Sequence, residues 1–174
     1  MQPKAVLLDR DGTLIYDLPP HANVRDVTLV PGVAIALARL RAAGIRIAVV
    51  SNQCGVGEGT LDVKRVHAIN QRIDELAGPI DGWFLCLHAA QSACDCRKPR
   101  PGLIFRAAKA LGVEPRDCVM IGDIGIDVEA ARRAGCRAIM IPTAQTLDSE
   151  IASAPEVAFD VLEAVDWLVE VAYA

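Results

Sequence analysis

Short apolar runs alternate with longer amphipathic stretches along this chain, and most of the apolar runs end at polar residues. Strands are expected at residues 5–8, 45–50, 83–85, 118–121, 137–141 and, as a short edge strand, 157–159. Helices are expected at residues 31–43, 61–76, 103–111, 127–134 and 161–171. Continuous apolar runs are typical of strands buried on both faces of a parallel sheet. The alternation of strands and helices therefore predicts an α/β fold.

Two carboxylates follow the first strand directly, in the segment Asp9-Arg10-Asp11-Gly12-Thr13. Ligands of open α/β sheets bind at the carboxyl ends of the strands, so chemistry is expected here. An aspartate at this place can attack phosphorus, and a second one two residues later can act as acid and then as base. The structural alternative is that Asp9 and Asp11 cap a turn, because Asp-Gly is a common turn sequence. Residues 14–28 come next, and we interpret them as a flap over the site or as an ordinary surface loop.

The second strand ends at Ser51-Asn52-Gln53, whose small hydroxyl and amide groups can hold phosphate oxygens. Residues 54–59 contain three glycines, and such a loop lets backbone N–H groups approach an anion. Glycines alone are a weak signal, and taken alone they favour a plain flexible loop before the next helix.

Four metal-ligating side chains lie between residues 86 and 96, namely Cys86, His88, Cys94 and Cys96. Three thiolates and one imidazole form a closed tetrahedral zinc set, with no open position for water. The sequence therefore predicts a structural zinc ion that holds a loop too short and polar to be held by burial. The alternative, buried cysteines beside a surface histidine, does not explain why four ligands cluster in one short loop.

The zinc loop leads directly into the basic segment Arg97-Lys98-Pro99-Arg100. We expect the metal loop to direct Arg97 and Lys98 at an anionic ligand, whereas the structural alternative is a solvated basic patch. The fourth strand then ends at Asp123, and with Asp9 and Asp11 it supplies the oxygen ligands that Mg²⁺ prefers. Asp127 opens the next helix, where it can cap the helix, support the site, or do both.

Composition narrows the class of protein further. The 174 residues are 52% hydrophobic but only 4% aromatic, which suits one α/β domain over residues 1–174 with an aliphatic core. A net charge of −4 without a basic block argues against nucleic acid as the main partner. Neither a signal peptide nor a membrane span is recognisable, and three of the six cysteines group with a histidine as metal ligands do. We therefore expect a cytoplasmic protein.

Taken together, these separated segments resemble the four motifs of the haloacid dehalogenase (HAD) superfamily of phosphatases. The matching residues, in the family's order, are Asp9 to Thr13, Ser51-Asn52, Lys98, and Gly122-Asp123 with Asp127. The resemblance covers residues 5–143 and implies a three-layer α/β/α doubly wound parallel sheet with a minimal cap or none. A domain of this kind can work as a monomer.

The resemblance also implies the chemistry. Asp9 is expected to attack phosphorus and form an aspartyl phosphate, while Asp11 protonates the leaving alcohol and then activates the hydrolytic water. Mg²⁺ is expected to be held by Asp9, by the backbone carbonyl of Asp11 and by Asp123.

The remaining matches concern the bound phosphate. Ser51 and Lys98 are expected to hold the phosphoryl group, and Arg97 helps to recognise the substrate. Thr13 and Asp127 have supporting roles.

The zinc loop and Arg97-Lys98-Pro99 resemble one branch of this superfamily, which contains D-glycero-D-manno-heptose bisphosphate phosphatases and histidinol-phosphate phosphatases. Pro101-Gly102 is more similar to the heptose group, whereas Glu58 stands where that group usually has an arginine. The resemblance implies a phosphatase acting on a phosphorylated small molecule, best a heptose 1,7-bisphosphate. Histidinol phosphate or another small phosphate ester is the alternative substrate, and an inactive zinc-stabilised binding module is the third hypothesis.

Overall fold

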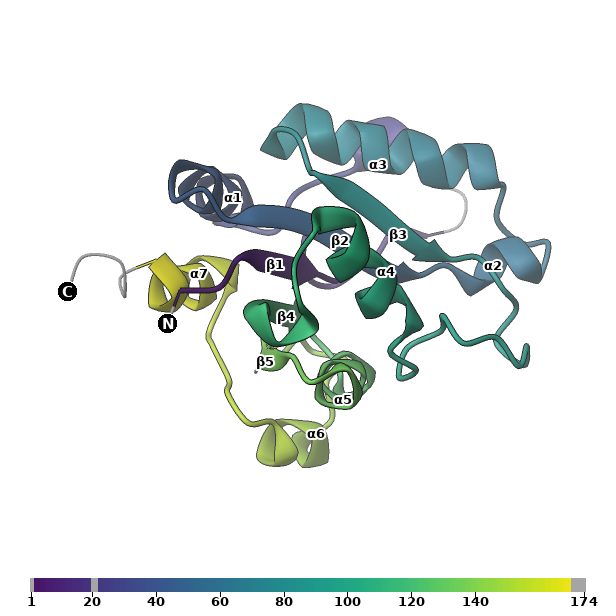
Figure 1. Ribbon diagram of the computed structural model, residues 1–174. Helices are drawn as coiled ribbons and strands as arrows, with labels where there is room; N and C mark the ends of the chain where they lie inside the picture. The colour runs from purple at the N-terminus through teal and green to yellow at the C-terminus, as the bar shows by residue number, and fades with distance from the viewer. Residues whose placement is uncertain (1, 20–21, 170–174) are drawn as a thin grey trace.

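Five strands form one parallel sheet in the computed structural model, which describes residues 2–19 and 22–169 (Figure 1). The strand order is β3-β2-β1-β4-β5. The strands are β1 (Ala5–Leu8), β2 (Arg46–Asn52), β3 (Gly82–Cys86), β4 (Cys118–Gly122) and β5 (Arg137–Met140). The central position of β1 places the residues that follow it between the ends of β2 and β4.

Helices cover both faces of this sheet, which confirms the α/β/α prediction. Helices α1, α3 and α7 pack on one face, and α4 and α5 pack on the other. The helices are α1 (Val33–Ala42), α2 (Cys54–Gly57), α3 (Val63–Ala77), α4 (Gly102–Leu111), α5 (Gly125–Ala134), α6 (Asp148–Ser153) and α7 (Val161–Val169). Two 3₁₀ turns, Val24–Asp26 and Pro115–Asp117, complete the described elements.

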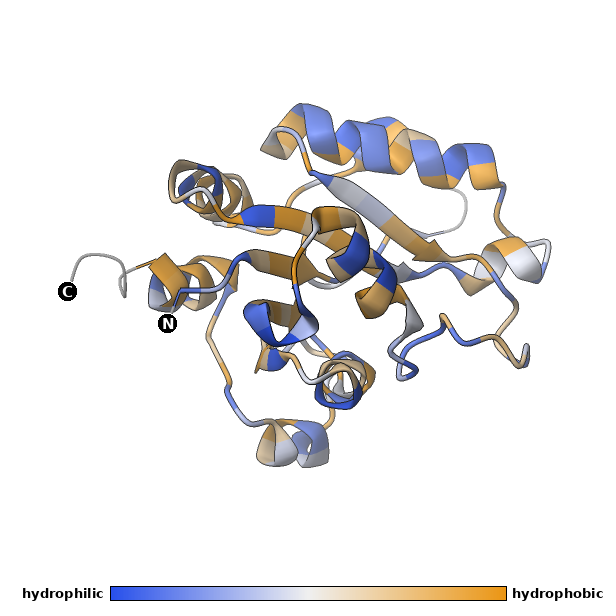
Figure 2. Ribbon diagram, in the orientation of Figure 1, coloured by the Kyte–Doolittle hydropathy of each residue, from blue (hydrophilic) through white to orange (hydrophobic). Residues whose placement is uncertain are grey.

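The strands are apolar throughout because both of their faces are covered. In β1, Val6 and Leu8 pack toward α1, α3 and α7, whereas Ala5 and Leu7 pack toward α4 and α5. All four side chains are fully buried. The strands at the centre of the sheet therefore appear as continuous hydrophobic segments in Figure 2.

The segment 14–28 differs from the predicted flap at both ends. Leu14 and Ile15 are fully buried in the core, and Ile15 bridges to Asp11 and to Leu29. Val27 is also buried. The chain thus returns to the core directly after the aspartates, because burying two aliphatic side chains stabilises more than exposing them. The stretch 16–19 is mostly exposed, and residues 20 and 21 of the predicted flap lie outside the described residues.

Smaller differences concern the ends of elements. Strand β2 continues through Asn52, and the predicted glycine loop begins as the one-turn helix α2. Helix α3 begins at Val63 because the Asp62 carboxylate accepts a hydrogen bond from the Lys64 backbone N–H at 2.8 Å. Helix α6 was not expected, and it is one short element within a polar segment.

The prediction of an edge strand at residues 157–159 is wrong, because that segment forms only an isolated bridge, between Val157 and Met140. The final helix is described as far as Val169, so residues 170 and 171 of its predicted range lie outside the described residues.

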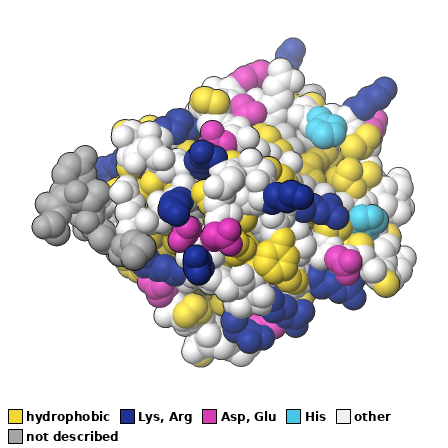
Figure 3. Space-filling model, viewed as in Figure 1, with side chains coloured by type: hydrophobic (Ala, Val, Ile, Leu, Met, Phe, Trp, Pro, Cys, Tyr) yellow, Lys and Arg dark blue, Asp and Glu magenta, His cyan; other side chains and the backbone are white. Residues whose placement is uncertain are grey.

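The described helices and one face of the surface bear on where the chain can lie. None of the helices there combines the length and the apolar composition that crossing a bilayer requires. On the face drawn in Figure 3, Lys and Arg side chains lie among Asp and Glu side chains, with hydrophobic side chains scattered between them.

Candidate active site and metal centres

The carboxyl edge of the sheet brings together the residues that the sequence separates most widely. Asp9 follows the central strand β1, and its backbone N–H donates to Ile121 in β4 at 2.9 Å. Ser51 lies near the end of β2, and Asp123 follows β4 directly. Lys98 follows β3 along the chain, two residues after the last cysteine of the Cys/His cluster. Parallel strands end at a common edge, which is why these positions converge.

Lys98 is the buried cation of this site. Its Nζ lies 2.8 Å from Asp9 Oδ1 and 2.6 Å from Asp127 Oδ1, and it donates to the Val50 carbonyl at 2.9 Å. Burial alone would lower the pKa of Lys98, but the charges of Asp127 and Asp9 raise it above its ordinary value. The ammonium group therefore stays charged beside Asp9.

Three carboxylates share the same small space. Asp9, Asp123 and Asp127 are buried, and each offers an oxygen within 4.8 Å of the others. Burial and the charge of Asp127 raise the pKa of Asp9 to about 6, although Lys98 opposes this. Burial, Asp127 and Asp9 raise the pKa of Asp123 to about 7. These three carboxylates leave an excess of buried negative charge that a divalent cation would offset.

The donor set also fits Mg²⁺ in its chemistry. Asp123 Oδ1 is buried and has no hydrogen-bond partner among residues 2–19 and 22–169. Mg²⁺ prefers oxygen ligands, usually one or two carboxylates together with water and phosphate. Gly12, at φ +80°, lies directly against this group, because a Cβ atom there would overlap the Asp123 carboxylate. The close approach of backbone and carboxylate explains the glycine.

Asp127 has both of the roles that the sequence left open. Its Oδ2 accepts a hydrogen bond from the Ile124 backbone N–H at 3.3 Å, which caps the first turn of α5. Its Oδ1 pairs with Lys98. Thr13 is fully buried beside the site, although no hydrogen-bond partner of its hydroxyl is found in the described part of the chain.

The Asp11 carboxylate is turned to a different set of partners. It lies 3.0 Å from Arg10 Nη2 and accepts a hydrogen bond from Gln53 Nε2 at 2.6 Å. Its side chain keeps 29% of its surface exposed. The Asp11 carboxylate is thus not part of the buried group formed by Asp9, Asp123 and Asp127.

The polar residues at the end of β2 differ in what they contact. Ser51 Oγ is buried and accepts a hydrogen bond from Gln53 Nε2 at 3.0 Å. Asn52 Nδ2 donates to the Lys98 carbonyl at 3.2 Å, and Asn52 Oδ1 accepts from the Lys98 N–H at 3.0 Å. The amides of Asn52 and Gln53, predicted to hold phosphate, are thus engaged within the protein, where they place Lys98 and Asp11.

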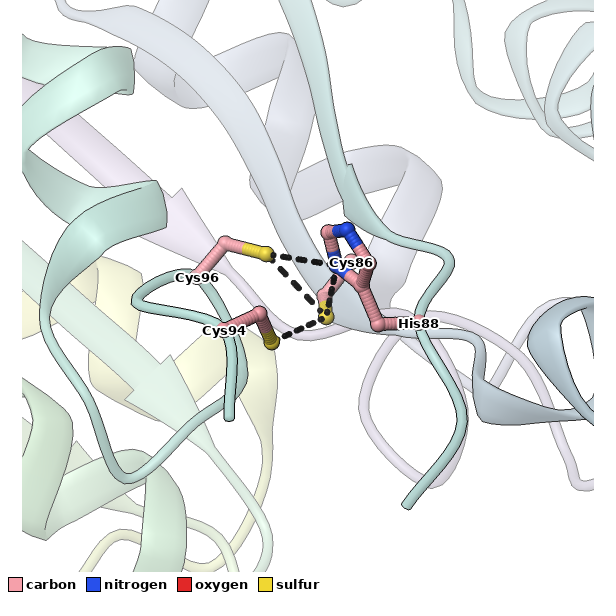
Figure 4. Close-up of side chains that lie close together, drawn as sticks. All are labelled: Cys86, His88, Cys94 and Cys96. Carbon is pink, nitrogen blue, oxygen red and sulfur yellow. Dashed lines mark hydrogen bonds between the residues drawn. The ribbon is translucent and has the colours of Figure 1, made fainter. Parts of the chain in front are cut away.

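The four predicted zinc ligands converge at the end of β3 (Figure 4). Cys86 Sγ lies 3.2 Å from Cys96 Sγ and 3.7 Å from Cys94 Sγ. His88 Nδ1 lies 3.6 Å from Cys86 Sγ and 3.2 Å from Cys96 Sγ. Ligands of tetrahedral zinc at a Zn–S distance of about 2.3 Å lie about 3.7 Å apart. The cluster is therefore of the size and composition that a zinc ion fits.

Helix α2 and the residue after it contact the loop of the Cys/His cluster in ways that the sequence did not reveal. Glu58 Oε1 accepts a hydrogen bond from the Ala90 backbone N–H at 3.1 Å. A Cβ atom at Gly57 would overlap the backbone of His88 and Ala89. Glu58, which stands where the heptose group usually has an arginine, is thus bound to the metal loop.

Arg97 borders a hollow beside the loop that carries the four-ligand cluster. This hollow has a volume of about 430 Å³ and is lined by Arg97, Arg100, Arg133 and Lys98. Arg97 Nη1 is buried and finds no hydrogen-bond partner among the described residues. A concave site with several guanidinium groups suits an anionic ligand.

One site residue was missed by the sequence reasoning altogether. Asn70 on α3 is buried and accepts a hydrogen bond from Arg10 Nη1 at 3.1 Å. It lies on the face of α3 that also buries Val66, Ile69 and Ile73. A lone amide on an apolar helix face is the signal in the sequence that points to such a contact.

Comparisons with known proteins agree with this geometry. Residues 95–168 match the model of the HAD-hydrolase-like family. A D-glycero-beta-D-manno-heptose-1,7-bisphosphate 7-phosphatase of Pseudomonas aeruginosa is 32% identical over 172 residues, which cover 95% of this chain and 97% of the relative. The protein of the same name from Haemophilus ducreyi is 33% identical over 162 residues, covering 86% of this chain and 89% of the relative.

A solved structure is similar over nearly the whole chain as well. It is the D,D-heptose 1,7-bisphosphate phosphatase from B. bronchiseptica complexed with magnesium and phosphate. The TM-score is 0.84 at 26% sequence identity, and the match covers 96% of this chain and 98% of that chain.

The central ion pair leads to a prediction about stability. Lys98→Met is expected to lower the free energy of unfolding by about 3–5 kcal/mol, because it leaves Asp9 and Asp127 buried without their cation. Urea denaturation at neutral pH without added Mg²⁺ measures this loss. Lys109→Met, at an exposed position of α4, is the matched control and is expected to stay within about 0.5 kcal/mol of the wild type. Equal stability of the two variants would contradict the importance of the ion pair.

Proposed function

Because this chain belongs to the haloacid dehalogenase (HAD) family of hydrolases, we propose that it is a magnesium-dependent sugar-phosphate phosphatase. Its substrate, by analogy with the relatives, is D-glycero-D-manno-heptose 1,7-bisphosphate, from which it removes the 7-phosphate. The observation that carries the proposal is the convergence of Asp9, Lys98 and Asp123 at one edge of the sheet, with Asp11 beside them. These residue types at one place are those that phosphoryl transfer through an aspartate needs.

The first half of the reaction forms a covalent intermediate. A carboxylate oxygen of Asp9 attacks phosphorus, and the bond from phosphorus to the sugar oxygen breaks. Asp11 gives its proton to that leaving oxygen, so that an alcohol departs and an aspartyl phosphate remains on Asp9. The pairing of Asp9 with Lys98 supports its role as the nucleophile, since the cation keeps the carboxylate ionised.

The second half returns the enzyme to its starting state. Asp11, now ionised, takes a proton from a water molecule as the water attacks phosphorus. The bond between phosphorus and Asp9 breaks, and inorganic phosphate leaves. Ser51 and Lys98 hold the oxygens of the transferred phosphoryl group. Catalysis depends mainly on stabilising the negative charge on these oxygens in the transition state.

Two metal ions have different roles in this proposal. Mg²⁺, held by Asp9, Asp123 and the Asp11 carbonyl, would supply positive charge next to the phosphoryl oxygens. Zn²⁺, held by the four-ligand cluster, would have no part in the chemistry, because three thiolates and one imidazole leave no position open for water. It would fix the loop that carries Arg97 and Lys98 into the site.

A loss-of-nucleophile variant tests the mechanism. Asp9→Asn is expected to abolish measurable release of phosphate, because an amide cannot form the acyl phosphate, while the circular dichroism spectrum stays that of the wild type. Asp148→Asn, at an exposed position of α6, is the control and should keep full turnover. Wild-type turnover in Asp9→Asn would disprove the aspartyl-phosphate mechanism.

A substrate panel tests the identity of the phosphate ester. Heptose 1,7-bisphosphate, heptose 7-phosphate and histidinol phosphate are compared with and without Mg²⁺, by measuring kcat/KM from released phosphate. We expect the bisphosphate to be preferred, because Arg97, Arg100 and Arg133 border the hollow beside the site. A higher kcat/KM for histidinol phosphate would overturn the substrate assignment but leave the reaction type intact.

The zinc assignment is tested by the metal content. The wild type is expected to retain zinc through dialysis, as measured by elemental analysis, whereas Cys94→Ser loses most of it and part of its turnover. Cys54→Ser removes a cysteine outside the cluster and should change neither quantity. Unchanged zinc content in Cys94→Ser would show that the cluster is not a zinc site.

A further inference from the structure

We propose that Arg10 and Asn70 are positioning residues that hold the Asp11 carboxylate in the orientation that proton transfer needs. The inference rests on the proposed phosphatase function, in which Asp11 protonates the leaving alcohol. It assigns a role to Arg10, which lies between the two aspartates in the sequence, and to Asn70 on α3.

The Arg10 guanidinium is buried, with 4% of its side chain exposed, and all three of its nitrogens are engaged. Nε donates to both oxygens of Asp11, at 3.2 and 3.1 Å. Nη2 lies 3.0 Å from Asp11 Oδ2 and donates to Gln53 Oε1 at 2.8 Å. Nη1 donates to Asn70 Oδ1 at 3.1 Å. A planar group bound on three sides has its orientation fixed, and so does the carboxylate that it clamps.

Asn70 anchors this clamp from α3. Its side chain lies among the buried apolar residues Val66, Ile69 and Ile73, where an aliphatic residue would pack without any polar group to satisfy. Asn70 Nδ2 is buried and lacks a hydrogen-bond partner within the described residues. Burying this half-satisfied amide is unfavourable for the fold, so the contact of its oxygen with Arg10 accounts for its presence.

Gln53 completes the network and connects it with the phosphate site. Its Oε1 accepts from Arg10, while its Nε2 donates to Asp11 Oδ2 at 2.6 Å and to Ser51 Oγ at 3.0 Å. The group that protonates the leaving oxygen and the hydroxyl that holds the phosphoryl group are thus fixed relative to each other. Such fixed geometry is what makes an intramolecular proton transfer efficient.

The alternative is that Asn70 and Arg10 only stabilise the fold. The two roles differ in their dependence on the leaving group. A sugar alkoxide is a poor leaving group and needs the proton of Asp11, whereas p-nitrophenolate leaves without one. Loss of orientation at Asp11 therefore lowers kcat/KM selectively for alkyl phosphates, because kcat/KM reports the formation of the aspartyl phosphate, in which the leaving group departs. Hydrolysis of that intermediate, in which Asp11 acts as the base, is common to all substrates and affects kcat instead. General damage to the fold lowers kcat/KM for alkyl and aryl phosphates alike.

The experiment compares full-length wild type and Asn70→Leu, loaded with Mg²⁺, on a sugar phosphate and on p-nitrophenyl phosphate. For the sugar phosphate we expect kcat/KM to fall by about 10- to 100-fold, part of the roughly 10²–10⁴-fold that a general acid supplies. For p-nitrophenyl phosphate we expect kcat/KM to fall by less than about threefold. Asn70→Asp, which keeps an oxygen for Arg10, is expected to restore most of the sugar-phosphate turnover.

Two further variants keep the test decisive. Gln71→Leu, at the exposed neighbouring position of α3, is the matched control and should leave both reactions unchanged. Arg10→Lys keeps the charge but loses the planar fork, so it should show the same selective loss even where Asn70→Leu folds poorly. Equal losses on both substrates, or no loss on either, would overturn this inference. Absence of activity in the wild type would instead overturn the proposed function.

Discussion

The structure depends on one electrostatic constraint, which is the burial of several carboxylates at the end of the central strand. Asp9, Asp123 and Asp127 repel one another, and burial makes that repulsion stronger. Lys98 offsets part of the repulsion through its two short contacts. The remaining buried negative charge is of the kind that a bound divalent cation offsets in proteins. In the proposed function, the binding of a phosphate group, itself an anion, depends on Lys98 and on this cation.

Placement of Lys98 is therefore the main task of the surrounding chain. Its side chain reaches the carboxylates from the far side of β2, and its backbone is held by two hydrogen bonds to Asn52. The metal cluster begins at the last residue of β3, next to Asn52 in the sheet register. In the proposed function, a zinc ion held by this cluster would fix the loop at the point where the site needs the charge of Lys98.

The sequence predicted the sheet, the metal cluster and the converging aspartates because each depends on local patterns. A buried apolar run that ends in Asp9-Arg10-Asp11 can be recognised from consecutive residues as a strand whose carboxyl end bears carboxylates. The ligands between Cys86 and Cys96 can likewise be recognised from their spacing. The contacts of Asn70 and Glu58 could not be predicted in the same way. Each joins residues far apart in the chain, and whether an amide on a helix or a carboxylate on a turn finds a partner depends on how the elements pack. The bounds of the predicted flap were wrong for a related reason, since Leu14 and Ile15 are too apolar to remain outside the core.

The contact between α2 and the metal loop has a consequence for how this fold can diverge. Gly57 leaves no room for a side chain against the backbone at His88 and Ala89, and Glu58 holds the N–H of Ala90. A lengthened loop or a bulkier residue on either side would push the two segments apart. A change in the length or bulk of one of these two segments is therefore expected to require a matching change in the other.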